Sequence, residues 1–172
     1  VPADSRDKVI ENLVNDILVK HDGHLSVGLI GMQWLMQTLT DIGRPDVAWK
    51  LVTQATRPSW GYMIGKGATT IWERWDSDTR DPGMNSEALL ILAGNLDAWF
   101  YQTLAGIRPD PSAPGFKSIV IQPYTETLEW VNCDHDSPYG RIVSNWKRDP
   151  STSLRAGGAL TMEVTIPANT TA

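Results

Sequence analysis

The sequence predicts an α+β protein, because helical periodicity dominates its first part and strand-like alternation dominates its last part. Over residues 6–20, apolar side chains recur every three or four positions, as on an amphipathic helix with one buried face. Beyond residue 116 they alternate with polar side chains, which is typical of half-buried strands. A proline-rich joint at residues 108–115 separates the two patterns. We therefore expect a helical domain over residues 1–107 and a β domain over residues 108–172.

About four helices are expected in the first domain, at residues 6–20, 26–42, 45–55 and 85–106. Ser26 is expected to cap the second helix, because a serine hydroxyl accepts from a free amide of the first turn. Gly43 is expected to end that helix, and Pro45 to open the third, where its missing amide costs nothing.

Four strands are expected in the second domain, at residues 118–122, 127–133, 140–147 and 159–166. Turn signals at Ser137-Pro138 and Gly157-Gly158 separate the later ones. The chain is expected to stop inside its sheet, so the β domain would be incomplete and would have unpaired edges that favour association.

Residues 57–83 form a long connection without periodicity, in which glycine, proline and tryptophan stand among polar residues. Structureless connections beyond about 12–15 residues are uncommon in compact domains and are usually functional. This segment is therefore where catalytic or binding residues are expected.

The composition excludes several classes of function. Twenty acidic against 15 basic residues give a formal net charge of −5, with no cluster of lysine and arginine, so nucleic acid is not an expected partner. No apolar run is long enough to span a membrane. A single cysteine, Cys133, excludes an internal disulfide and leaves the cellular compartment undetermined. Because the chain begins with Val1, an upstream region is expected to be missing.

A resemblance to a known family appears at Pro-Ser-Trp-Gly-Tyr-Met-Ile (58–64), Gly-Ala-Thr-Thr-Ile-Trp-Glu-Arg-Trp-Asp (67–76) and Met-Asn-Ser (84–86). Further matches follow in order at residues 99–101, 104–107, 114–117, 137–140 and 166–170. These motifs resemble the C-terminal part of glycoside hydrolase family 78, the α-L-rhamnosidases. A colinear match along nearly the whole chain is more specific than one short motif.

The resemblance implies a fold and a substrate class. It implies part of an (α/α)6 toroid, followed by part of a C-terminal β-sandwich, in a chain that is a C-terminal fragment of the whole enzyme. The implied partner is a rhamnose-containing glycoside or polysaccharide, with no cofactor. The isolated fragment is expected to be inactive and to self-associate, because a partial toroid exposes helix faces that its neighbours would bury.

Glu73 is the residue that matches the general base of the family. The implied mechanism is inverting: one carboxylic acid protonates the leaving oxygen, and a carboxylate about 6.5–9.5 Å away activates water. The general acid would belong to an earlier segment that this chain lacks. The residues alone leave two interpretations open. Glu73 lies between two tryptophans, where partial desolvation would raise its pKa, but it could instead form an ion pair with Arg74 or a contact at a helix end, as most acidic residues are merely solvated.

Four aromatic side chains are candidates for the wall of a sugar pocket: Trp60, Tyr62, Trp72 and Trp75. Indole rings suit this role because a flat apolar face covers the C–H face of a pyranose. The alternative is core packing, which explains most buried aromatics. His24 is a further candidate, either bonding a sugar hydroxyl or serving as a structural histidine.

Two further features bear on the site. Where the family often has an Asn-His pair, this chain has Ala88 and Leu89, so substrate handling there is expected to differ. A metal site is not expected, because the possible ligands do not have four-ligand spacing; these are His21, His24, Cys133 and His135. The alternatives to an enzyme are a non-catalytic carbohydrate-binding module and a structural remnant.

Overall fold

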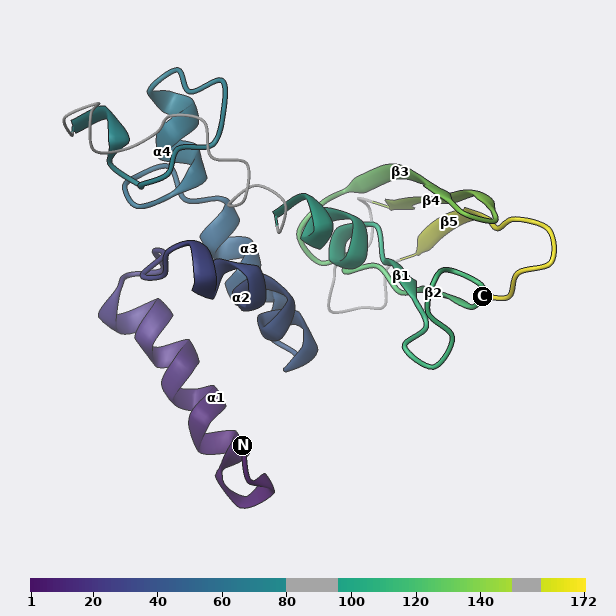
Figure 1. Cartoon of the computed structure of the whole chain (residues 1–172), viewed down its shortest axis with the longest axis horizontal. Helices are drawn as coiled ribbons and strands as arrows, with labels where there is room; N and C mark the ends of the chain where they lie inside the picture. The colour runs from purple at the N-terminus through teal and green to yellow at the C-terminus, as the bar shows by residue number, and fades with distance from the viewer. Residues whose placement is uncertain (80–95, 150–158) are drawn as a thin grey trace. The chain divides into compact units, whose positions relative to one another are not determined.

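The computed structural model describes residues 1–79, 96–149 and 159–172, and it contains two compact units, Val1–Leu96 and Asp97–Ala172 (Figure 1). The described part of the first unit is helical, and the second contains antiparallel sheets. The predicted α+β class is confirmed. The first unit's elements are η1 (Ala3–Ser5), α1 (Arg6–Asn15), η2 (Asp16–Lys20), α2 (Leu29–Asp41), α3 (Pro45–Val52), α4 (Trp60–Gly65) and η3 (Ser77–Thr79).

The core of the first unit lies where α2 and α3 pack. Met32, Met36 and Leu39 of α2 and Val47 and Leu51 of α3 are almost completely buried. By contrast, α1 buries no residue fully, and its apolar side chains remain half-buried or exposed. The continuous helix predicted for residues 6–20 is confirmed, with its last five residues in the π-helical segment η2.

The boundaries of α2 confirm one predicted signal and correct another. Gly43 adopts a positive φ of 78°, and the Arg44 amide donates to Leu39 O at 2.7 Å, so glycine ends the helix as expected. The prediction that Ser26 caps α2 is wrong. The N-cap is Gly28 and makes no side-chain cap, because the chain stays non-helical for two further residues after Ser26.

The second unit holds two antiparallel sheets. One pairs β1 (Ile107–Pro109) with β2 (Ile119–Ile121), and the other has the order β3–β4–β5, formed by Trp130–Ser137, Gly140–Arg148 and Leu160–Thr165. A small core joins the sheets through Ala105, Ile107, Ile119 and Ile142. Compared with the predicted strands, β3 begins later and runs longer, and β1 was not predicted.

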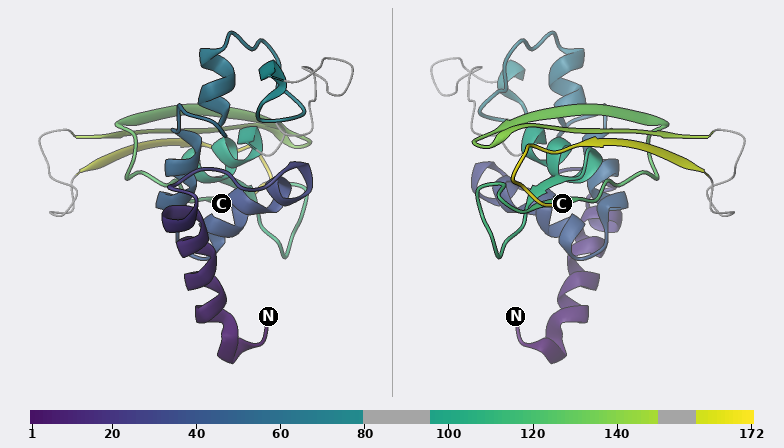
Figure 2. Two further views of the ribbon diagram at one scale, coloured as in Figure 1. Left: turned by 90° about the vertical axis from the view of Figure 1, so that its left-hand side faces the viewer. Right: turned by 90° about the vertical axis from the view of Figure 1, so that its right-hand side faces the viewer.

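The end of the last helix is fastened by the strands that follow it. The segment η5 (Phe100–Leu104) lies against one face of the three-stranded sheet (Figure 2). Trp146 Nε1 of β4 donates to Leu104 O at 2.8 Å, and Ser144 Oγ donates to Ala105 O at 2.7 Å. The final carbonyls of a helix have no intrahelical donor, so these buried side chains supply the missing hydrogen bonds.

Two backbone amides complete the same set of hydrogen bonds. Tyr124 N donates to Thr103 O at 2.7 Å, and Gln122 N donates to Gly106 O at 3.0 Å. Gly106 has a φ of 75°, and a Cβ atom there would overlap the backbone of Gln122 and Pro123. Only glycine fits this close approach. These hydrogen bonds join η5 to the sheets, and η5 lies in the second unit with them. The predicted domain division between residues 107 and 108 stays a prediction.

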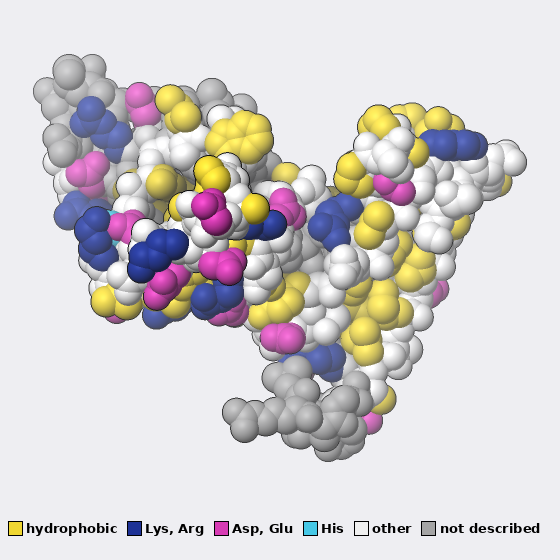
Figure 3. Space-filling view, turned by 90° about the horizontal axis from the view of Figure 1, so that it is seen from below, with side chains coloured by type: hydrophobic (Ala, Val, Ile, Leu, Met, Phe, Trp, Pro, Cys, Tyr) yellow, Lys and Arg dark blue, Asp and Glu magenta, His cyan; other side chains and the backbone are white. Residues whose placement is uncertain are grey.

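One face of the first unit carries charges of both signs. Acidic and basic side chains are interspersed over the first unit on the face that Figure 3 displays. Among the described residues, no helix combines the length and apolar character needed to cross a membrane.

We predict that Ser144→Ala destabilises the chain by about 1–3 kcal/mol, because it leaves the buried Ala105 carbonyl without a donor. The measurement is the urea midpoint followed by circular dichroism, with Ser26→Ala, at an exposed position, as the matched control. Equal midpoints for the two variants would contradict this role for Ser144.

Candidate functional site

The helix α4 positions the aromatic segment that the sequence singled out. Ser59 is fully buried, and its Oγ accepts from the amide of Tyr62 at 3.0 Å, capping the helix. A Cβ atom on Gly61 would overlap Gln54 O, so glycine lets α4 approach the preceding backbone closely. These two local requirements fix where Trp60 and Tyr62 point.

The four predicted aromatic residues form two edge-to-face pairs. Trp60 packs on Trp75 with ring centroids 5.6 Å apart, and Tyr62 packs on Trp72 at 6.4 Å, both with interplanar angles of 84°. This geometry suits aromatic quadrupoles, which favour edge-to-face contact. Trp75 Nε1 also donates to Val27 O at 3.0 Å, which ties the connection to the segment before α2.

The burial of these rings is uneven. Trp60 and Trp72 are each 4% exposed, whereas Tyr62 and Trp75 are partly buried. Within the described part of the chain, Trp60 Nε1 is buried and has no hydrogen-bond partner. A buried N–H without a partner carries a desolvation cost, so Trp60 is held in place by packing at the expense of this donor.

Tyr62 has a hydrogen-bond partner that the sequence did not indicate. Its hydroxyl donates to Asp78 Oδ2 at 2.9 Å, Lys66 Nζ lies 5.4 Å from its ring centroid, and Lys66 Nζ lies 3.9 Å from Asp78 Oδ2. The hydrogen bond to Asp78, together with partial burial, raises the pKa of Tyr62 above its ordinary value of 10.0. The i, i+4 spacing of Tyr62 and Lys66 on α4 is the sequence signal that could have revealed the lysine contact. No comparable signal marks Asp78.

Glu73 lies in a bend directly between buried Trp72 and exposed Arg74, and its own side chain is exposed. Ser77 Oγ accepts from Arg74 N at 3.3 Å and donates to Arg74 O at 3.2 Å, which stabilises the turn that follows Glu73. The carboxylate is thus placed at the surface beside the aromatic cluster. Its assignment as a general base stays a prediction.

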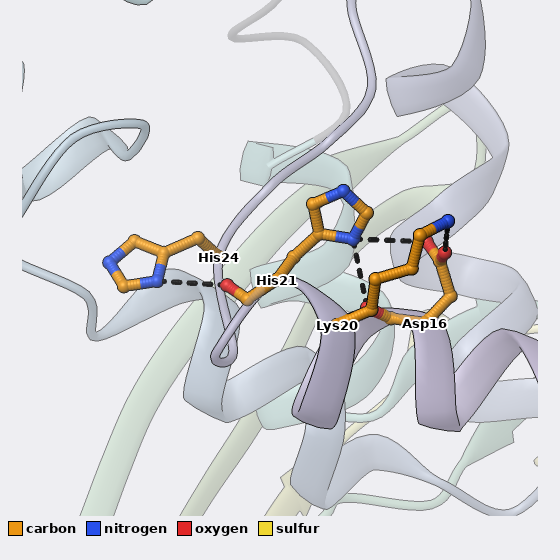
Figure 4. Close-up of polar contacts among 4 residues, drawn as sticks. All are labelled: Asp16, Lys20, His21 and His24. Carbon is orange, nitrogen blue, oxygen red and sulfur yellow. Dashed lines mark hydrogen bonds and ion pairs between the residues drawn. The ribbon is translucent and has the colours of Figure 1, made fainter.

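His24 lies in the turn after η2, and both its ring nitrogens have protein partners. Nδ1 donates to the carbonyls of His21 at 3.2 Å (Figure 4) and Asp22 at 3.0 Å. With the proton on Nδ1, Nε2 accepts from Thr56 Oγ1 at 2.7 Å. His24 therefore ties this turn to the segment before α4, and its predicted contact with a sugar stays a prediction.

Two other sequence features concern substrate handling and a possible metal ion. Ala88 and Leu89, which replace the Asn-His pair, lie outside the described residues. Across residues 1–79, 96–149 and 159–172, no three side chains of His, Cys, Asp or Glu gather in a way that could hold a metal ion.

Comparisons with protein families divide the chain into two matches. Residues 1–104 match the bacterial alpha-L-rhamnosidase six-hairpin glycosidase domain, and residues 106–172 match the bacterial alpha-L-rhamnosidase C-terminal domain. The chain is also similar to curated proteins named alpha-L-rhamnosidase. It is 36% identical to one from Streptomyces avermitilis over 177 residues, covering 100% of this chain and 16% of that protein. It is 35% identical to one from Formosa agariphila over 170 residues, covering 94% and 17%.

The chain is also similar to solved structures of alpha-L-rhamnosidases. An alpha-L-rhamnosidase from Dictyoglumus thermophilum superposes with a TM-score of 0.88 at 35% identity, covering 99% of this chain and 18% of that one. The Streptomyces avermitilis alpha-L-rhamnosidase complexed with L-rhamnose superposes with a TM-score of 0.86 at 38% identity, covering 99% and 16%. The chain thus spans only about 16–18% of the length of these relatives.

We predict that Asp78→Asn lowers the pKa of Tyr62 toward 10.0, because the phenol then ionises without a carboxylate beside it. Since the folded-state pKa is raised, the stability this contact gives is complete below about pH 10 and is lost as the pH rises through the raised pKa. The pKa of Tyr62 is measured from the absorbance of tyrosinate during an alkaline titration. The difference between each protein and its Tyr62→Phe variant identifies the Tyr62 signal. An unchanged Tyr62 titration in Asp78→Asn would contradict the assigned cause.

Proposed function

Because this chain belongs to the bacterial alpha-L-rhamnosidase family, we propose that it supplies the general base and part of the sugar pocket of an enzyme that hydrolyses terminal α-L-rhamnosyl residues. The complete activity requires a longer chain, since the relatives named alpha-L-rhamnosidase are several times longer than this one. The substrate class is a rhamnose-containing glycoside or polysaccharide. The relative complexed with L-rhamnose supports that choice of sugar.

The observation that carries the proposal is the position of Glu73 on an exposed bend, next to Trp72 and two residues before Trp75, each a member of an edge-to-face aromatic pair. A general base must reach a water molecule, and an exposed carboxylate meets this requirement. In an inverting hydrolysis, Glu73 would take a proton from water as the water attacks the anomeric carbon. The general acid would protonate the leaving oxygen from the opposite face of the sugar, and it would come from a segment outside this chain.

Tyr62 and Trp75 are the partly exposed rings of the four, so they would contact the sugar directly, and the buried Trp60 and Trp72 would support them. Rhamnose adds an apolar C5 methyl group, which suits an aromatic wall. Trp60, whose ring packs on Trp75, would hold that ring in place.

One observation favours a second candidate, a non-catalytic carbohydrate-binding or structural role. Trp60 and Trp72 are 4% exposed, and both nitrogens of His24 have protein partners, so these side chains already have structural functions. Under this alternative, Glu73 would be one of many solvated carboxylates, and removing its charge would leave turnover unchanged.

We predict that Glu73→Gln lowers kcat by about 10²–10⁴-fold in a chain that contains the complete catalytic domain, with little change in KM. The amide keeps the size of the side chain but cannot accept the proton from water. Release of the aryl group from an aryl α-L-rhamnoside measures the rate. Glu11→Gln is the matched control, because Glu11 is an exposed residue of α1 whose side chain is 72% exposed. Unimpaired turnover by Glu73→Gln would exclude Glu73 as the base.

A further inference from the structure

The outer face of the three-stranded sheet carries a second set of side chains suited to a ligand. This face is turned away from η5, β1 and β2, whereas the alternate residues Ile142, Ser144 and Trp146 are buried on the inner face (Figures 1 and 2). The strand register places Trp130, Lys147 and Thr161 in one row across β3, β4 and β5. The next row on the same face contains Asn132, Asn145 and Glu163.

These rows line a surface hollow of about 410 Å³. Its volume falls within the range of about 300–1,000 Å³ typical of small-molecule sites. The Trp130 ring lies at one end of the hollow and is 58% exposed. The exposed ring stands beside the amide, hydroxyl and charged groups that line the same hollow, an arrangement that suits a ligand with both apolar and polar surface.

The polar groups of the second row are held in a defined arrangement. Asn145 Oδ1 accepts from the backbone amide of Cys133 at 3.2 Å, and Asn145 Nδ2 donates to Glu163 Oε2 at 3.5 Å. The side-chain amide is therefore oriented across all three strands. Its fixed position leaves the second Nδ2 hydrogen and the remaining lone pairs of Glu163 available to a ligand.

We infer that this outer face binds a neutral oligosaccharide. The Trp130 ring would cover the C–H face of one sugar unit, and Asn132, Glu163 and Thr161 would bond hydroxyl groups of the same or the next unit. One cation, Lys147, and one carboxylate, Glu163, balance each other in formal charge, which favours a neutral ligand over an anionic one. The site lies on a different unit from Glu73 and does not depend on the proposed catalytic role.

The test uses the 172-residue chain and the indole N–H signals of its eight tryptophans in a two-dimensional NMR spectrum. The probes are cellohexaose, xylohexaose, mannohexaose and a rhamnose-capped oligosaccharide at millimolar concentrations. We expect at least one probe to shift the Trp130 signal, identified by its loss in Trp130→Phe. Because the Trp60 signal is read in the same spectrum, binding at the proposed catalytic pocket is distinguished from binding at the sheet.

Matched variants decide whether the hollow is the binding site. Trp130→Ala is expected to weaken binding by about tenfold or more, as when a central aromatic contact is truncated. Glu163→Gln is expected to weaken it several-fold. Trp34→Ala, which removes a tryptophan that is 68% exposed on α2, is expected to leave the affinity unchanged. Failure of every probe to shift the Trp130 signal, or binding that survives Trp130→Ala, would overturn the inference.

Discussion

The carbonyl groups at the end of a helix must find hydrogen-bond donors, and in this chain the following sheet provides them. Trp146 and Ser144 of β4 donate to Leu104 O and Ala105 O, both in buried surroundings. Because these donors lie some 40 residues further along the chain, the helix end is complete only when β4 is in place. Gly106 makes the turn from the helix into β1, since a side chain there would overlap the backbone of Gln122 and Pro123. The second unit thus depends on a polar requirement of the backbone as much as on its small apolar core.

The candidate site follows from a similar constraint in the first unit. Over residues 57–79 the connection contains the short helix α4 and several turns, and side-chain hydrogen bonds hold these pieces in place. Ser59 caps α4, Trp75 bonds Val27 O, and His24 bonds Thr56, which together tie residues 54–79 to the helical core. The edge-to-face pairs of aromatic rings then place the exposed bend at Glu73 beside buried indoles. Rigid support of this kind is what a catalytic carboxylate requires, because small displacements cost much of the rate.

The sequence predicted those features that depend on local pattern. Periodicity was sufficient for residues 6–20, and Gly43 marked the end of α2 because a positive φ favours glycine. The Ser26 cap failed because the residues after it stay non-helical. The strand β1 was not predicted because it is three residues long and its last two, Arg108 and Pro109, belong to the proline-rich joint. In the site, motif matching placed the four aromatic residues in one segment, and the structure pairs Trp60 with Trp75 and Tyr62 with Trp72. The Tyr62 bond to Asp78 spans 16 residues of aperiodic chain, so no sequence pattern could have indicated it.

The claim that Glu73 is the base of an inverting enzyme is tested most directly by chemical rescue of Glu73→Ala in a chain with the complete catalytic domain. Truncation leaves space on the face from which water attacks, and azide needs no base to attack there. The account predicts that azide restores cleavage of an aryl α-L-rhamnoside and that NMR identifies the product as the β-L-rhamnosyl azide, inverted at the anomeric carbon. An α-configured azide product, or a Glu73→Ala variant that hydrolyses the substrate as fast as the unchanged enzyme, would contradict it.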